Sequence, residues 1–429
     1  MSKKLSLFSL SLLALLIGTV PADAAKKEAA AQEETADTYE MLNLFGEVME
    51  RAKVSYVEEV SDKKLIESAI NGMLVSLDPH SSYLDDQSFK YMNEQTKGKF
   101  GGLGIEVTME SGVVKIVSPI DDTPASEAGL KPGDYITNID GEQVVGMSLN
   151  DAVDKMRGKV GTKVKLTIRR INEKPFDVVL KREEIKIQSV KSDIKAKNVI
   201  YIRITSFTED TDKMIEKAVK KAQNILKNDV KGIVLDVRNN PGGLLDQAVG
   251  VSDLFLNKGE IVSTRSRNVE DTVKYSAKEG DIAEGLPIVV LVNDGSASAS
   301  EIVAGALQDH KRAVILGEKT FGKGSVQTII PLGKYGAMRL TTARYYTPSG
   351  RSIQATGIVP DVVVHPAKVE EIKNDFERSE AEFGNALKNE TIGENQQNNT
   401  QVIDKDLQRD YQLSRAVDLV KALSIYKKQ

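Results

Sequence analysis

The chain has 429 residues, with 58 basic and 62 acidic side chains and a net charge of −4 at pH 7. Its length predicts two or three domains, and its mild acidity disfavours a nucleic-acid binder, which normally carries a basic stripe. The sequence has no cysteine and three histidines. This excludes disulfides, iron–sulfur clusters and cysteine nucleophiles, and it argues against a histidine-rich metal site.

Residues 1–24 have the pattern of a signal peptide. Lys3 and Lys4 precede a mostly apolar stretch over residues 5–20, and residues 22–24 (ADA) match an A-x-A cleavage signature. The stretch is short for a membrane span, and an uncleaved N-terminal anchor is the alternative. We therefore expect an exported protein, periplasmic or otherwise extracytoplasmic, and membrane-associated if the segment is retained.

Residues 25–97 predict a spacer followed by a helical region. Residues 25–37 are charged and small, which is typical of a flexible spacer. Over residues 39–77 the apolar residues recur at helical spacing, with Ser61 and Asp62 as an N-cap signal, which predicts two amphipathic helices. Their apolar faces serve either a dimer interface or packing on the chain's own core.

Residues 98–183 predict a compact, β-rich module with two short helices. Its glycine-rich bend at residues 100–104 (FGGLG) either forms a plain turn or holds a peptide's terminal carboxylate while the next strand pairs with the peptide backbone. The predicted peptide-binding residues are Gly101, Gly102, Leu103, Gly104, Ile105, Val107, Val153 and Met156.

Residues 184–365 alternate apolar strands with helices, which indicates an α/β domain around a buried, largely parallel sheet. Residues 366–429 then form a polar linker, rich in Gln and Asn at 396–401, and a last amphipathic helix over about 407–426. The apolar face of this helix poses the same choice between a dimer interface and the chain's own core.

Ser298 lies where an apolar strand turns into a helix. Such a turn exposes a side chain beside free helix N–H groups, which suits a serine nucleophile and its oxyanion. The sequence from Ser298 to Glu301 also fits a capping box, so Ser298 alternatively serves only as an N-cap.

A base for this serine is less evident. His310 follows 12 residues along the same helical stretch, which is about 18 Å along a helix. His80 and His365 lie beside prolines in loop-like sequence. Lys323, flanked by Gly322 and Gly324, is the other candidate if burial lowers its pKa; otherwise it is a solvated surface charge.

Residues 317–323 (GEKTFGK) match the start of a P-loop. However, Gly324 stands where a Ser or Thr should bind magnesium, and the residues after it predict a strand instead of a helix. Nucleotide binding is therefore disfavoured, and we expect no cofactor and no metal site.

Taken together, several motifs resemble those of the carboxyl-terminal processing (tail-specific) serine peptidases, over nearly the whole length after the signal segment. They are residues 77–84 (LDPHSSYL), 102–105 (GLGI), 129–134 (GLKPGD), 236–243 (DVRNNPGG), 295–301 (GSASASE), 322–327 (GKGSVQ), 350–354 (GRSIQ) and 357–361 (GIVPD). His80 stands where an aromatic residue is common in that family.

The resemblance implies a crotonase-like α/β peptidase core with an inserted PDZ domain that recognises substrate tails. It implies that Ser298 is the nucleophile, Lys323 the general base and Gln327 the residue that orients the lysine. The oxyanion hole would consist of the N–H of Ala299 with that of Gly242 or Gly243. Ser296 and Ser300 are then not nucleophiles.

The expected function is thus an exported serine endopeptidase that cleaves proteins near their C-termini, and its partners are proteins with accessible C-terminal tails. The alternative is a catalytically inactive PDZ module that only binds tails; intact Ser298, Lys323 and Gln327 favour the enzyme. A homo-oligomer formed through the terminal helices and an adaptor protein are left open, and no nucleic-acid partner is expected.

Overall fold

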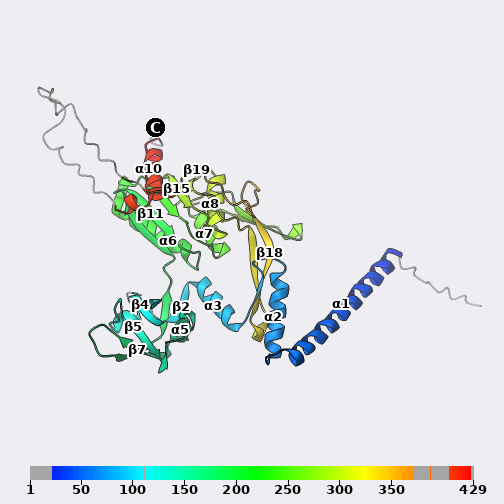
Figure 1. The fold of residues 1–429 in the computed structure, drawn as a ribbon. Helices are drawn as coiled ribbons and strands as arrows, with labels where there is room; N and C mark the ends of the chain where they lie inside the picture. The colour runs from blue at the N-terminus through cyan, green and yellow to red at the C-terminus, as the bar shows by residue number, and fades with distance from the viewer. Residues whose placement is uncertain are drawn as a thin grey trace, which may run out of the picture. The chain divides into compact units, whose positions relative to one another are not determined.

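The computed structural model describes residues 22–426 apart from 111, 121, 369, 371–386 and 388–404 (Figure 1). Residues 1–21 of the signal-like segment and most of the polar linker, including 396–401, lie outside the described residues. The chain divides into two units, residues 1–77 and 78–429, and each is described by itself.

The N-terminal unit consists of two helices, α1 (Ala22–Ser55) and α2 (Asp62–Val75). The expected spacer at residues 25–37 is wrong, because those residues lie within α1. They are mostly Ala, Glu, Lys and Gln, which are strong helix formers. Ser61 caps α2 by accepting a hydrogen bond from the Lys64 N–H.

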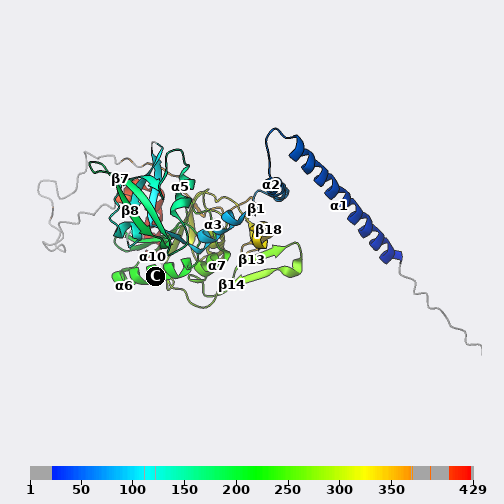
Figure 2. The ribbon, with the colours of Figure 1, turned by 90° about the horizontal axis from the view of Figure 1, so that it is seen from below.

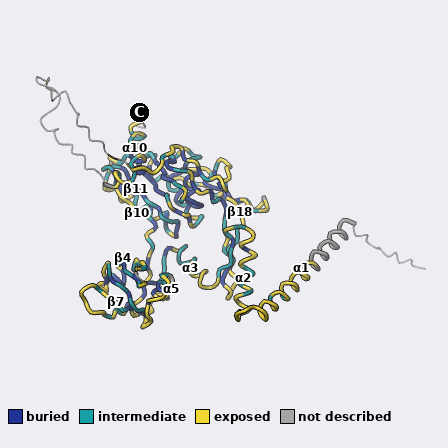
Figure 3. The backbone as a smooth tube through the Cα atoms, in the orientation of Figure 1, coloured by how far each residue is buried: buried dark blue, intermediate teal, exposed yellow. Residues whose placement is uncertain are grey.

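The described part of α1 exposes its apolar side chains (Figure 3). They are Tyr39, Met41, Leu42, Leu44, Phe45 and Val48. This face therefore does not pack on a core of its own unit. None of the helices in the described ranges is both long enough and apolar enough to cross a membrane.

The second unit begins with a short strand, a helix and a β-rich module. Their elements are β1 (Ser82–Leu84), α3 (Asp86–Lys97), β2 (Lys99–Gly102), β3 (Ile105–Glu110), β4 (Val113–Pro119), α4 (Pro124–Glu127), β5 (Tyr135–Ile139), β6 (Glu142–Gln143), α5 (Leu149–Met156), β7 (Lys163–Arg169), β8 (Phe176–Lys181) and β9 (Glu183–Lys186). The module's sheet has the order β3-β4-β5-β7-β8, with β6 paired to β5, and encloses its own apolar core.

The α/β domain is built on a second sheet of six strands in the order β10-β11-β12-β15-β16-β19. The strands are β10 (Val190–Lys195), β11 (Val199–Ile204), β12 (Gly232–Asp236), β15 (Ile288–Val292), β16 (Val314–Gly317) and β19 (Val362–Val363). All neighbours are parallel except β10 and β11. Parallel strands are buried on both faces, and every residue of β12 and β15 is buried.

Helices cover both faces of this sheet. One face packs against α6 (Thr211–Leu226), α7 (Leu245–Asp253) and α8 (Ala299–Asp309), and the opposite face packs against α10 (Tyr411–Tyr426). Short helical segments are η1 (Lys227–Asp229), η2 (Val269–Asp271), η3 (Gly333–Tyr335) and α9 (Lys405–Arg409). Leu413, Val417 and Val420 of α10 are buried against the sheet, so this helix uses its apolar face within the chain (Figure 1).

A separate antiparallel sheet belongs to the same unit. It has the order β1-β18-β13-β14, with β17 paired to β18; its further strands are β13 (Glu260–Ser266), β14 (Val273–Ser276), β17 (Ser325–Pro331) and β18 (Ala337–Tyr346). Figure 2 shows the β13–β14 hairpin. The long strand β18 pairs with β1 on one side and with β17 on the other, which brings residues 82–84 beside residues that follow them by about 250 positions.

Candidate active site

Ser298 occupies the turn between β15 and α8. Its side chain is buried and its backbone adopts φ 55° and ψ −112°, a region that L-residues other than glycine avoid at a cost of about 1–3 kcal/mol. Ser298 is the last residue of this turn, directly before the first residue of α8. The Ala299 N–H follows at the first helical position, where no acceptor within the helix exists.

The two neighbouring serines have structural partners. The Ser296 hydroxyl donates to the backbone oxygen of Val237 at 2.8 Å, and the Ser300 hydroxyl donates to that of Asn240 at 3.0 Å. Both side chains are fully buried. These two serines therefore fasten the turn to the loop after β12, and Ser298 is the serine at the strained position.

Glu301 connects Ser298 to the loop that carries Lys323. One carboxylate oxygen accepts the backbone N–H groups of Ser298 at 2.8 Å and of Lys323 at 2.9 Å. The other accepts the Gly322 N–H at 2.7 Å and the Thr320 hydroxyl at 2.5 Å. Glu301 is fully buried, so these donors replace its water. The glutamate half of the expected capping box is thus present, and this glutamate also contacts a second loop.

Lys323 lies in the loop between β16 and β17 and is partly buried. Burial lowers the pKa of Lys323 below its usual value, and the positive charge of Arg339 lowers it further, while Asp78 acts in the opposite direction. Such a lysine is neutral more often than a solvated one, as a base requires. Residues 325–331 after it form strand β17, so the P-loop alternative lacks its helix.

Gln327 follows on β17, two residues after Ser325. Its amide nitrogen donates to the Ser325 hydroxyl at 2.9 Å and to the Thr341 hydroxyl at 3.3 Å. With both amide hydrogens engaged, the amide oxygen is the group that is left to accept a hydrogen bond.

The loop after β12 lies directly against Ser298. Gly242 has φ +105°, and a Cβ there would come within 2.9 Å of the Ser298 Cβ, so only glycine fits. Its N–H donates to the side-chain oxygen of Asn240 at 2.9 Å. Of the two glycines considered for the oxyanion hole, Gly243 is therefore the one whose N–H this contact does not occupy.

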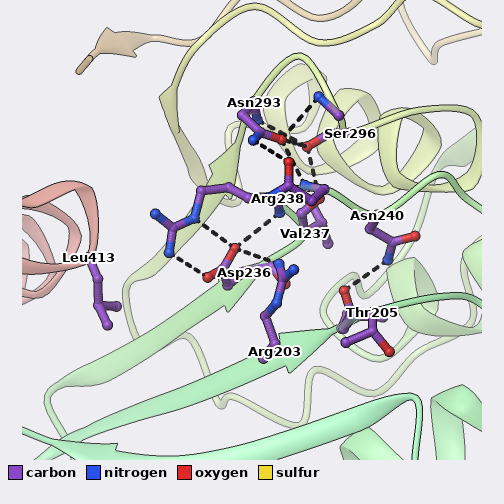
Figure 4. Close-up of polar contacts among 12 residues, drawn as sticks. Arg203, Thr205, Asp236, Val237, Arg238, Asn240, Asn293, Ser296 and Leu413 are labelled. Carbon is purple, nitrogen blue, oxygen red and sulfur yellow. Dashed lines mark hydrogen bonds and ion pairs between the residues drawn. The ribbon is translucent and has the colours of Figure 1, made fainter. Parts of the chain in front are cut away.

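An ion-pair network holds the start of the same loop (Figure 4). Asp236 at the end of β12 accepts from Arg203 at 3.0 Å and from Arg238 at 2.7 Å. Arg238 also donates to Asp410, at the start of α10, at 2.6 and 2.9 Å. The C-terminal helix is thus tied to the loop that carries Gly242 and Gly243.

The three histidines have different surroundings. His310 lies at the C-terminal end of α8, the end opposite to Ser298, and its ring contacts the backbone oxygen of Glu260 at 2.7 Å. His365 pairs with Glu318 and is exposed. His80 is the histidine that interacts electrostatically with Lys323: burial lowers the pKa of His80, and the charge of Lys323 lowers it further.

Comparison with known proteins agrees with the motifs. Residues 198–364 match the model of peptidase family S41, residues 115–170 match the PDZ domain, and residues 17–88 match the N-terminal domain of the activating protease CtpB. A carboxy-terminal-processing protease of Bartonella bacilliformis is 52% identical over 388 residues, which cover 90% of this chain and 89% of that protein. The chain belongs to this peptidase family.

Two further relatives of this S41 peptidase are less similar in sequence. The carboxy-terminal processing protease CtpA of Bacillus subtilis is 41% identical over 73% of this chain, and the match spans 66% of that protein. A solved photosystem II D1 C-terminal processing protease is 31% identical, with a TM-score of 0.44, and the match covers 73% of this chain and 85% of that structure.

In the PDZ domain of this S41 peptidase, β3 lies at the edge of the sheet. Ile105 and Val107 on β3 and Val153 on α5 are half-buried, whereas Leu103 and Met156 are buried in the module's core. Gly101 and Gly102 pair with β9, which leaves Leu103 and Gly104 as the bend. A Cβ on Gly104, at φ +74°, would collide with Thr123.

Sequence reasoning missed the roles of three residues at this site, Asp78, Thr341 and Arg339, and it missed the second role of Glu301. Asp78 belongs to a motif that was noted without a role, and the Thr341 hydroxyl donates to its carboxylate at 3.0 Å across 263 residues. No local pattern predicts that contact, because it follows from the pairing of β1 with β18.

Glu301→Gln tests the link between the two loops. An amide nitrogen cannot accept, so two of the four donors lose their partner in a buried site. We expect the free energy of unfolding to fall by about 2–4 kcal/mol and peptidase activity to fall with it, as measured by chemical denaturation and substrate cleavage. Glu318→Gln is the control, because Glu318 lies in the loop that carries Lys323 but is partly exposed. It should change neither the stability nor the activity. Unchanged stability in Glu301→Gln would contradict the link.

Proposed function

We propose that the S41 peptidase is an exported serine endopeptidase with a Ser298–Lys323 dyad on a crotonase-like core, and that it cleaves proteins near their C-termini. One observation carries the proposal: a single buried carboxylate accepts the backbone N–H groups of both Ser298 and Lys323. That arrangement sets the positions of a strained serine and a partly buried lysine relative to each other.

In the proposed reaction, neutral Lys323 removes the proton from the Ser298 hydroxyl as Oγ attacks the scissile carbonyl carbon. The N–H groups of Ala299 and Gly243 stabilise the oxyanion, with each such donor worth about 3 kcal/mol. The protonated lysine then gives its proton to the leaving amine, and the acyl-enzyme forms. Water, deprotonated by Lys323, attacks the ester, and the proton returns to Ser298 as the acid is released.

Two further residues, Gln327 and Tyr345, enter this proposal. The amide oxygen of Gln327 accepts from the Lys323 amine and directs its lone pair. Tyr345 lies next to Ser298: burial raises the pKa of Tyr345 to about 12, and the Ser298 hydroxyl acts in the opposite direction. Tyr345 is therefore a neutral phenol at working pH. The catalytically inactive alternative has no observation in its favour.

A dyad with a lysine base predicts a specific set of inactive variants. Ser298→Ala and Lys323→Ala, which remove the nucleophile and the base, should each reduce casein cleavage by at least about a thousandfold. Lys323→Arg should be equally inactive, because arginine keeps its proton and cannot act as a base. Ser296→Ala and Ser300→Ala, if folded, should retain activity. His80→Gln is the control for a histidine base and should also remain active, as should His310→Gln and His365→Gln. An active Lys323→Arg, or an inactive but folded His80→Gln, would contradict the dyad.

The pH dependence provides an independent test. Arg339 lowers the pKa of Lys323, so Arg339→Gln should raise that pKa and move the acidic limb of the kcat/KM profile to higher pH. Lys334→Gln removes the same charge from an exposed position and should leave the limb in place. A limb that stays fixed in Arg339→Gln would show that the rate does not follow the ionisation of Lys323.

For the PDZ domain, we propose that substrate tails add to the free edge of β3 with the terminal carboxylate at the Leu103–Gly104 bend. Full-length Ser298→Ala protein should bind a peptide with a free apolar C-terminus at least about tenfold tighter than the corresponding amide, as measured by fluorescence anisotropy. Val153→Asp should weaken binding, and Val179→Asp, exposed on the far strand β8, should not. Equal affinity for acid and amide would contradict this mode.

Export rests on the signal-like residues 1–24, with cleavage or retention as an anchor as the two alternatives. The exposed apolar face of α1 favours a homo-oligomer formed through that helix, whereas α10 has its apolar face buried within the chain. An adaptor protein is a further partner that this proposal allows. Among the described residues, no group of three or more His, Asp or Glu side chains has the arrangement of a metal site.

A further inference from the structure

Three side chains from different parts of the chain form a hydrogen-bonded relay, and one of them, Asp78, interacts electrostatically with Lys323. Gln327 on β17 donates its amide nitrogen to the Thr341 hydroxyl on β18 at 3.3 Å. The Thr341 hydroxyl lies 3.0 Å from the Asp78 carboxylate. All three residues are partly buried, so water has limited access to compete for these hydrogen bonds.

The chemistry of the carboxylate sets the direction of every hydrogen bond in the relay. An ionised Asp78 can only accept, so the Thr341 hydroxyl must donate its single hydrogen to it. The Thr341 oxygen can then only accept from Gln327, which must present its nitrogen. The amide oxygen of Gln327 is consequently turned away from Thr341.

Asp78 is itself rigidly held. Its carboxylate accepts the backbone N–H groups of His80 at 2.8 Å and Ser81 at 3.0 Å, and the Ser81 hydroxyl at 2.7 Å. The Ser81 hydroxyl in turn accepts the Thr341 N–H at 3.1 Å. Asp78 and Ser81 therefore both contact Thr341 of β18. These two hydrogen bonds fix the position of the Asp78 carboxylate relative to that strand.

We propose that Asp78 and Thr341 are positioning residues that orient the amide of Gln327, so that its oxygen accepts a hydrogen bond from the amine of Lys323. The inference rests on the proposed function, in which Lys323 is the base. It assigns a role to the Asp78 loop, whose residues come more than 200 positions before Lys323 in the chain.

The charges around Lys323 agree with an ionised Asp78. Burial alone would raise the pKa of Asp78, but the hydrogen bonds from Ser81, His80 and Thr341 outweigh it and hold the pKa below its usual value. Arg339 and His80 also interact electrostatically with Lys323, and Glu301 contacts its backbone. Asp78 is thus a carboxylate, and an acceptor only, wherever the enzyme works near neutral pH.

The relay is tested by removing the hydroxyl and keeping the shape. Thr341→Val should lower kcat roughly 10- to 100-fold, because a misplaced group costs about that much, and should change KM less than about threefold. Thr341→Ser restores the hydroxyl and should return kcat to within about threefold of the parent. The matched control is Thr342→Val: the next residue of β18, with a cross-strand hydroxyl partner in Thr328 and an exposed site. It should keep parent kinetics.

A double-mutant cycle separates positioning from a general loss of structure. If Thr341 acts through Gln327, the double variant Thr341→Val/Gln327→Ala should be no slower than Gln327→Ala alone. Multiplied losses would overturn the proposal, as would a Thr341→Val enzyme with parent kcat. An active Lys323→Ala would instead overturn the proposed base, so the two failures are distinguishable.

The pH profile gives a readout for Asp78. Asp78→Asn keeps an acceptor oxygen but removes the negative charge that raises the pKa of Lys323. The acidic limb should therefore move to lower pH, and kcat should fall because the carboxamide no longer imposes one direction on the relay. An unchanged kcat in folded Asp78→Asn would contradict the role of its charge.

Discussion

The buried carboxylate of Glu301 is the interaction on which the geometry of the site depends. It accepts four hydrogen bonds, none longer than 2.9 Å, from residues on both sides of the site. A buried carboxylate that loses a hydrogen-bond donor cannot replace it with water, which is costly. A shift of either loop alone is therefore unfavourable. The Thr320 hydroxyl also accepts the Ile358 N–H at 2.7 Å, which extends the same constraint to the segment before β19. The turn at Ser298, the lysine loop and this third segment therefore form one rigid assembly.

Local features of the site were predictable because they depend on residues close in sequence. A continuous apolar strand followed by DGSASASE predicts the turn at Ser298. The strand that follows Lys323 was predicted as well, and it decided against a P-loop. The contact of Asp78 with Thr341 was not predictable, since it requires the register of β1 against β18. The family resemblance supplied the motif at residues 77–84 but no physical role for it.

One prediction was wrong and one choice was left open, and both have simple physical origins. Residues 25–37 lack an apolar core pattern and were therefore predicted to be a spacer, but helix propensity alone carries α1 through them. Gly242 and Gly243 were equivalent in the sequence, since both lack a side chain. Only the fold distinguishes them, because Asn240 bends back to accept the Gly242 N–H while its own amide nitrogen donates to the backbone oxygen of Ile204 at 2.9 Å.

The pairing of Arg238 with Asp410 has a consequence for biosynthesis. Arg238 lies at the start of the loop that carries Gly242 and Gly243, whereas Asp410 follows Arg238 by 172 residues along the chain. While the chain is being synthesised, the loop beside Ser298 lacks this partner until Asp410 has emerged from the ribosome. The face of the sheet that α10 covers remains open for the same period. The loop beside Ser298 can therefore reach its final arrangement only after α10 has been synthesised, long after the loop itself has left the ribosome.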